Sequence, residues 1–453
     1  MTSAQHDLTS GPIPQLLIKM AIPIGIGLLL QTLYFVVDLY FVSSLGDAAV
    51  AGVGIAGNLN FLIIALTQIF NVGVTALISQ AVGRKATDEA QSDFNQALLL
   101  CGVFAFITLL LGYGFADVYI NTLSDDPATV ENAHIYLWWF LPNMALQFAM
   151  TVMIAGLRGI GVVKPTMMVQ LVSVLINIVL APVLISGWLT GHAFGVLGAG
   201  LASSIAAGVG FLLLASYFKR SSSFLKIDLY RLKPMLCTWQ RIVAIGLPTG
   251  GEFVLMFSYM AIVYWALQDF GAHAQAGFGI GQRVMQSMLM PGLALSFAAP
   301  AIVGQNFGAG QAQRVRDIQA TLLKMNVIVL GSLGAMCIIF GEHMMRFFTH
   351  EAPVIATGAE YLFWTGFAFM PSVVILSCNG IYQGLGNTWP ALFSSLCRIS
   401  IIILGVYGLM QSAEFESVHL WQLSLLANAI QATISYLLLR RLMSKKLAVI
   451  PAG

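Results

Sequence analysis

The chain has 453 residues, of which 58% are hydrophobic and 9% are charged, and its formal net charge is +2. A water-soluble core cannot bury so large an apolar fraction, so the composition excludes an ordinary soluble enzyme or binding domain. We therefore expect the lipid bilayer to surround the chain, and we expect no nucleic-acid partner.

Apolar runs long enough to cross a membrane recur along the whole chain. About 20 helical residues, at 1.5 Å each, span a hydrocarbon core of roughly 30 Å. Backbone groups in lipid need hydrogen-bond partners within their own segment, so each run is expected to be a helix. The twelve predicted spans are residues 15–44, 50–80, 94–116, 131–157, 163–188, 193–217, 240–268, 274–305, 318–343, 353–382, 389–412 and 418–441.

Basic residues gather in the loops on one side of this predicted arrangement. Cytoplasmic loops carry an excess of Lys and Arg, so both termini are predicted to be cytoplasmic, as in a multi-pass protein of a bacterial inner membrane. The polar first fourteen residues lack a signal-peptide pattern, so no cleaved leader is expected. The basic loop residues include Arg84, Lys85, Arg158, Lys164, Lys219, Arg220, Arg241, Arg314 and Arg316, whereas the opposite loops include Asp47, Asp125, Asp126 and Glu131.

The two halves of the chain repeat each other. Sliding the chain against itself at one fixed offset aligns Gly, Pro, Tyr and Gln residues without a gap, which apolar composition alone does not explain. We predict a lobe over 1–218, a linker over 219–240 and a lobe over 241–453. Two pseudo-symmetric six-helix bundles of this kind can rock around a central cleft, as alternating-access transporters do. The matched pairs include Pro23 with Pro248, Gly25 with Gly250, Tyr34 with Tyr259, Gln80 with Gln305, and Pro165 with Pro390.

Ionisable residues inside the spans are the first functional candidates, because a charge there costs at least ~2.5 kcal/mol unless it has a partner or water. Asp38 lies in the first span, and helical spacing places Gln31 and Tyr34 on the same face. An amide and a phenol can hydrogen-bond toward its carboxyl, which makes Asp38 a candidate for proton exchange. The alternative is a structural acid bonded to a neighbouring helix.

Glu252 is the second acidic candidate, near the middle of the seventh span. The repeat aligns Asp38 with Val263 and Glu252 with Gly27, so each half carries one acid at a different depth. This asymmetry suggests proton coupling in one half and contact with a cationic substrate, or a second coupling site, in the other.

Other residues in the spans are weaker candidates. Asn177 in the fifth span could reach Asp38, although such residues more often join helices. Arg283 and Arg398 need partners or a route to the interface. Tyr259, Met256 and Met260 are candidates for a cleft that accepts varied apolar cations, although most such residues pack the core or face lipid.

Taken together, these features resemble the multidrug and toxic compound extrusion (MATE) family. The resemblance covers essentially the whole chain. It rests on the twelve spans in two lobes and on five segments in order: FVVDLYFVSSLG at 35–46, ISQAVG at 78–83, GLRGIGVVKP at 156–165, LINIVLAP at 175–182 and GLGNTWP at 384–390.

The resemblance implies roles for particular residues. In members that use the first lobe, the first-span Asp and fifth-span Asn form the cation or proton site, which implicates Asp38 and Asn177. A further Asp found in some members is replaced here by Ala181. Members with a second-lobe sodium site pair a seventh-span Glu with a tenth-span Asp, but Glu252 lies about one turn early and Ser372 occupies the Asp position. The pattern favours protons over sodium as the coupling ion. It also favours the DinF-like branch of the family.

We therefore predict a secondary transporter that exports amphipathic, mostly cationic compounds in exchange for H⁺, with Na⁺ as the alternative ion. We expect a monomer without a cofactor, a bound metal or an enzymatic activity. One alternative is a flippase of lipid-linked precursors, which would want a basic cavity for pyrophosphate. Two others are a membrane-embedded enzyme, for which no nucleophile or HExxH motif is evident, and a passive channel.

Overall fold

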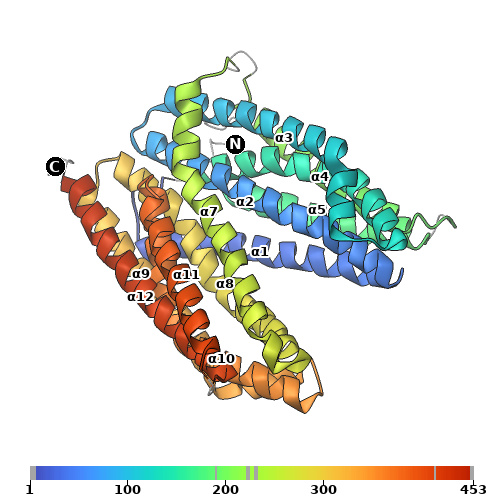
Figure 1. The fold of residues 1–453 in the computed structure, drawn as a ribbon. Helices are drawn as coiled ribbons and strands as arrows, with labels where there is room; N and C mark the ends of the chain where they lie inside the picture. Colours follow the sequence, from blue (N-terminus) through green and yellow to red (C-terminus); the bar gives the residue numbers. More distant parts are fainter. Residues whose placement is uncertain (1–6, 189–190, 221–224, 229–232, 413–414, 449–453) are drawn as a thin grey trace. The chain divides into compact units, whose positions relative to one another are not determined.

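The computed structural model describes residues 7–188, 191–220, 225–228, 233–412 and 415–448. Residues 221–224 and 229–232 of the predicted linker lie outside that part. The described residues form twelve long α-helices and one short 3₁₀ helix, Gln268–Phe270, without a strand (Figure 1). The α-helices are α1 (Ile13–Ser43), α2 (Asp47–Gly83), α3 (Thr87–Leu123), α4 (Pro127–Gly159), α5 (Lys164–Ile185), α6 (Val196–Arg220), α7 (Leu236–Ala266), α8 (Ala272–Gly308), α9 (Ala312–Arg346), α10 (Ala352–Gly384), α11 (Trp389–Met410) and α12 (Ser417–Ala448).

All twelve helices are long and apolar enough to cross a membrane, which confirms the predicted all-α polytopic fold. Several helices extend beyond the predicted spans. The third span was predicted over 94–116, whereas α3 begins at Thr87 and ends at Leu123. Its first turn contains Asp88 and Glu89, which favour a helix N-terminus but are too polar for a hydrocarbon core. The apolar pattern therefore marks only the part of each helix that lipid surrounds.

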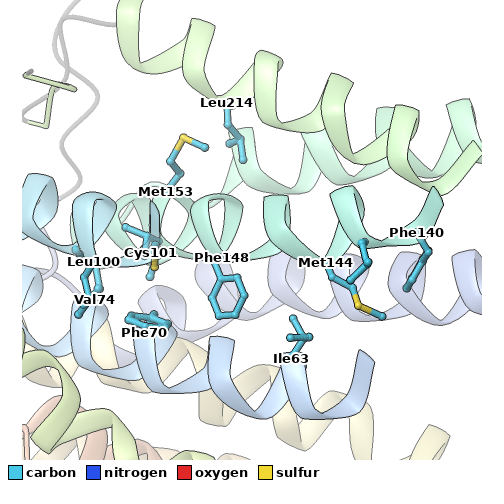
Figure 2. Packing of buried hydrophobic residues seen from close by; sticks show 14 of the residues in the cluster. Ile63, Phe70, Val74, Leu100, Cys101, Phe140, Met144, Phe148, Met153 and Leu214 are labelled. Atoms are coloured by element: carbon cyan, nitrogen blue, oxygen red, sulfur yellow. The ribbon is translucent and has the colours of Figure 1, made fainter. Parts of the chain in front are cut away.

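The first compact unit consists mainly of Ile26–Gly246. Within it α4 is the central helix, which packs against α2, α3 and α6, while α5 packs against α6. Rings fill the space between these helices, and Figure 2 shows Phe70 and Phe148. The ring centroids of Phe70 and Phe148 lie 5.9 Å apart, and those of Phe70 and Phe104 lie 5.1 Å apart. Ile63 and Met144 continue this core (Figure 2). This core joins α2, α3 and α4, and α6 packs against α4 and α5.

The start of α7 also belongs to the first unit, because it lies against α2 at two glycines. A Cβ atom added to Gly246 would lie 1.9 Å from the backbone oxygen of Ile69. A Cβ atom added to Gly73 would lie 2.4 Å from the backbone oxygen of Ile242. Only residues without a side chain permit this approach of the two backbones, which is a common device between membrane helices.

The described part of the linker is held to the first unit by buried amide side chains of α3. Asn95 is fully buried; its Nδ2 donates to the backbone oxygen of Lys226 at 3.0 Å, and its Oδ1 accepts from the backbone N–H of Asp228 at 2.8 Å. Gln96 binds the backbone of Lys233 at 2.7 Å and that of Met235 at 2.9 Å. These bonds satisfy backbone groups that no helix pairs.

We predict that Asn95→Ala exposes the linker to protease. The substitution removes the two hydrogen bonds from Asn95 to the backbone of Lys226 and Asp228 and leaves those from Gln91 in place. A net contribution of about 0.5–1.5 kcal/mol for each lost bond corresponds to roughly tenfold faster local opening. Trypsin digestion of the purified protein, followed by mass spectrometry of the cut after Lys226, measures this. Asn121→Ala, at an exposed site near the other end of α3, is the matched control. Equal cleavage in both variants would contradict the role of Asn95.

The second compact unit contains Leu8–Gly25 and Leu247–Gly453. Within it α10 is the central helix, which packs against α8, α9 and α12, and α11 packs against α12. The Phe278 ring stacks on Trp421 with centroids 5.6 Å apart, and Tyr361 meets Trp421 edge-on at 5.0 Å. This aromatic core joins α8, α10 and α12.

The segment that precedes α1 joins the second unit through hydrogen bonds to α8 and α9. The backbone N–H of Leu8 donates to Oε1 of Gln305 at 3.1 Å, and Nδ2 of Asn306 donates to the backbone oxygen of Leu8 at 2.9 Å. Arg314 donates to the backbone oxygen of Gly11 at 2.7 Å. By its contacts, Leu8–Gly25 thus groups with the second half of the chain, and the start of α7 groups with the first.

Candidate coupling and substrate sites

Asp38 lies on α1 about one turn before the helix ends, and only 8% of its surface is exposed. The Nδ2 group of Asn177 on α5 donates to its Oδ1 at 3.3 Å. The hydroxyl of Ser203 on α6 donates to its Oδ2 at 2.9 Å. Three helices therefore meet at one carboxyl group, and the side chains that bond its two oxygens are both neutral.

Two tyrosines complete the surroundings of this carboxyl. The Tyr34 hydroxyl lies close to both Asp38 and Ser203. Its position near Asp38 agrees with the helical spacing of the two residues on α1. Tyr136 on α4 is buried beside the same acid. Gln31, expected on this face, is exposed while Asp38 is buried. The structure thus brings Asp38, Asn177 and Tyr34 together, and it places Gln31 in more open surroundings.

One acceptor in the site has no hydrogen-bond partner. The Oδ1 atom of Asn177 is buried and unpaired among the described residues. An ionised Asp38 can only accept hydrogen bonds, but a protonated one carries an O–H that can donate. The site therefore offers two donors to the ionised carboxylate, and it also contains a buried acceptor that has no partner among the described residues.

Glu252 lies on α7 in the second unit, and its partners differ from those of Asp38. The hydroxyl of Ser395 on α11 donates to its Oε1 at 3.0 Å, and Gln431 on α12 donates to the same hydroxyl at 3.0 Å. The side chain of Asn379 on α10 also lies close to the carboxyl group. This is a second acid, partly buried, whose carboxyl accepts a hydrogen bond from a neutral hydroxyl in a separate unit from the first.

A cavity of about 150 Å³ lies inside the second unit, between α7, α8, α10, α11 and α12. Tyr259, which the sequence suggested as a candidate for a substrate cleft, lines this cavity, and so do Arg398 and Ser372. Ser372 donates to the backbone oxygen of Ala368 within its own helix. Met256 and Met260 do not line this cavity.

A family comparison decides the class of this protein. The MatE family model matches residues 23–183 and again residues 248–407. This chain belongs to the MATE family. The two matches begin at residues 23 and 248, the pair of prolines that the internal alignment superposes, so each half of the chain matches the family model separately.

Relatives of this MATE protein agree with that assignment over nearly their whole length. A probable multidrug resistance protein of Bacillus subtilis is 24% identical over 401 residues, covering 88% of each chain. A FAD transporter of Shewanella oneidensis is 23% identical over 410 residues, covering 89% of this chain and 90% of its own. A solved multidrug resistance MATE transporter in an outward-facing conformation has a TM-score of 0.90, 21% identity and coverage of 98% and 99%. The likeness to that structure confirms the MATE fold.

Sequence reasoning missed Ser203 as a partner of Asp38. Ser203 lies in the small-residue run AGLASSIAAG on α6, and serine is common in such runs because it lets helices approach closely. Its neighbour Ser204 points to a different helix and donates to the backbone oxygen of Trp139 at 2.5 Å. Helical periodicity alone could not show which of the two serines faces α1.

We predict that Ser203→Ala slows transport by this MATE protein without unfolding it. A hydrogen bond to a charged group contributes about 1.5–3 kcal/mol, so its loss at Asp38 corresponds to a rate reduction on the order of tenfold. Ser204→Ala, one residue away, is expected to stay near the wild-type rate. Initial efflux rates at matched protein levels measure both, and equal rates for the two variants would show that Ser203 does not support the carboxyl.

Proposed function

We propose that this MATE protein exports amphipathic, mostly cationic compounds in exchange for protons across a bacterial cytoplasmic membrane. The observation that carries the proposal is Asp38, a buried carboxyl in a membrane helix whose oxygens are bonded only by neutral side chains. A buried carboxylate without a positive partner is costly, so the site favours any cation or proton that neutralises it.

Competition for this carboxyl supplies a physical basis for antiport. A proton on Asp38 removes the negative charge that a cationic substrate would otherwise meet, so the two ligands weaken each other's binding. External protons reach Asp38, change its hydrogen bonding with Asn177 and Ser203, and release the substrate outward. The protonated protein then returns to the inward-facing state and loses its proton to the cytoplasm. Both termini lie on the cytoplasmic side, and the protein works as a monomer.

The available energy fits an exchange of one ion for another. Each proton contributes about 1.4 kcal/mol per pH unit and about 2.3 kcal/mol per 100 mV of membrane potential. Exchange of one proton for one monovalent cation moves no net charge, so only the pH term drives it. A pH difference of one unit then supports about a tenfold concentration ratio of substrate.

Protons suit the first unit better than sodium does. A hard cation wants several oxygen ligands with compensating negative charge. Asp38 is the one carboxylate of this site among the described residues, and buried Ala181 stands where some family members carry another acid. These features agree with the DinF-like branch that the sequence favours.

The other candidate functions have less support. A flippase of lipid-linked pyrophosphates needs several basic groups in its cavity. The first unit instead presents an acid, and the cavity of the second unit contains a single arginine among its described lining residues. A passive channel would let substrate equilibrate and could not accumulate it against a gradient.

Everted membrane vesicles from efflux-deficient cells test the proposal. Accumulation of ethidium or norfloxacin is measured with an imposed pH gradient without sodium, and then with a sodium gradient at equal pH. We expect the pH gradient alone to drive accumulation and an uncoupler to abolish it. Accumulation that requires sodium would contradict proton coupling and make Glu252, with Ser395 and Asn379 beside it, the leading coupling site.

A further inference from the structure

Arg398 is a charged residue inside a membrane helix that the proposed proton exchange does not use. It lies near the middle of α11, is partly buried, and lines the 150 Å³ cavity of the second unit. A cation at this depth is expensive unless it has a partner, so its presence points to a function.

The guanidinium group makes few of the hydrogen bonds that it can make. Its Nη1 donates to Oδ1 of Asn428 on α12 at 3.4 Å, which is a long bond. Its Nε–H is buried and has no partner among the described residues. An arginine has five N–H donors, and unpaired buried donors are costly, so the site lacks an acceptor.

The neighbouring acid does not supply that acceptor. Glu252 lies near enough to Arg398 for the two side chains to interact electrostatically. The described residues nevertheless include no ion pair between them within 4 Å. The carboxyl of Glu252 is instead bonded to Ser395 and does not line the cavity. Arg398 is the one charged residue among the described residues that line it. The cavity wall therefore presents a positive charge at Arg398.

Aromatic rings form much of the remaining wall. The guanidinium carbon of Arg398 lies 5.3 Å from the centroid of the Tyr259 ring, and the Tyr259 hydroxyl bonds to that of Ser424 at 3.2 Å. Trp364, Tyr361 and Trp421 also line the space. A cavity of about 150 Å³ accommodates roughly one benzene ring. Its walls thus match one flat ring that carries an acceptor at its edge.

We propose that the second unit binds an aromatic carboxylate, with the ring between the aromatic side chains and the carboxylate on Arg398. Bidentate pairing of a guanidinium with a carboxylate matches both groups in shape and charge. The inference rests on the proposed export function and names a chemical class of substrate, or part of a substrate, that the acidic first unit does not attract. The two units then recognise groups of opposite charge.

Three isosteric probes test this in purified protein in nanodiscs: benzoate, benzamide and benzamidine are anionic, neutral and cationic forms of one shape. Saturation-transfer NMR titrations give their dissociation constants. We expect benzoate to bind at least about tenfold more tightly than benzamide, because a charge-assisted pair is about twice as strong as a neutral one, and benzamidine to bind most weakly. Equal affinities, tighter binding of benzamidine, or no binding of benzoate would overturn the proposal.

Variants assign the preference to one residue. Arg398→Gln should remove the preference for benzoate over benzamide, and Arg398→Lys should keep part of it. Arg283→Gln, at an exposed arginine of α8, should leave it unchanged. A preference that survives Arg398→Gln would refute the site. Nanodiscs carry no ion gradient, so benzoate binding there does not require proton antiport. Binding of benzoate by Asp38→Asn protein therefore tests this inference separately from the proposed antiport. Either proposal can fail while the other holds.

Discussion

Asp38→Asn is expected to abolish the accumulation of substrate that a pH gradient drives. The asparagine keeps the size and most of the hydrogen-bonding capacity of the carboxyl, but it cannot bind or release a proton. The exchange therefore loses its coupling group, and the concentration ratio should fall from about tenfold per pH unit to one. Substrate uptake into everted vesicles with an imposed pH gradient measures this directly.

A matched acid on the same unit controls for the loss of a charge. Asp47 is exposed in the first turn of α2, so Asp47→Asn should accumulate substrate as the wild type does. Thermal unfolding of both purified variants shows whether either is misfolded. Normal accumulation by folded Asp38→Asn protein would mean that another group couples transport, and Glu252→Gln would then be the variant to test.

Gly246→Ala is expected to destabilise the folded protein severely. Its Cβ would lie 1.9 Å from the backbone oxygen of Ile69, and a backbone atom cannot rotate away as a side chain can. Helix α7 would have to move off α2, which costs at or above the upper end of the roughly 1–3 kcal/mol typical of overpacking. We expect a marked fall in the temperature at which the detergent-solubilised protein loses its monodisperse elution peak.

The helix propensity of alanine sharpens this comparison. Alanine is favoured over glycine in a helix by about 1 kcal/mol, so a harmless Gly→Ala change should be neutral or stabilising. Gly208 on α6 has open space around its added Cβ, and Gly208→Ala is therefore the control. If Gly246→Ala is as stable as Gly208→Ala, then α2 and the start of α7 do not pack as closely as described.

The membrane-spanning helices could be predicted because lipid imposes one simple requirement, an apolar run of sufficient length. Their ends could not, because a helix continues through polar residues once it leaves the hydrocarbon. The ninth span was predicted over 318–343, whereas α9 extends from Ala312 to Arg346. The grouping of the segment around Leu8 with the second unit was also not predictable, since it depends on hydrogen bonds from Gln305 and Asn306.

The candidate sites were predictable to the extent that their residues are expensive in lipid. Asp38 stood out for that reason, and the resemblance to the family supplied Asn177. Ser203 did not stand out, because a hydroxyl costs little in a membrane helix and its direction depends on packing. Arg398 was noticed only as a charge that needs a partner, whereas its position over the Tyr259 ring joins α7 to α11 and is a tertiary contact.

Proton flux driven by a substrate gradient alone is the most direct test of proton antiport through Asp38. Purified protein is reconstituted into liposomes that contain a pH-sensitive dye, without sodium and with the membrane potential clamped, and an ethidium gradient is then imposed. We expect protons to move opposite to ethidium, and we expect Asp38→Asn liposomes to show no proton flux. Ethidium flux without proton movement, or flux that appears only with sodium, would contradict proton antiport through Asp38.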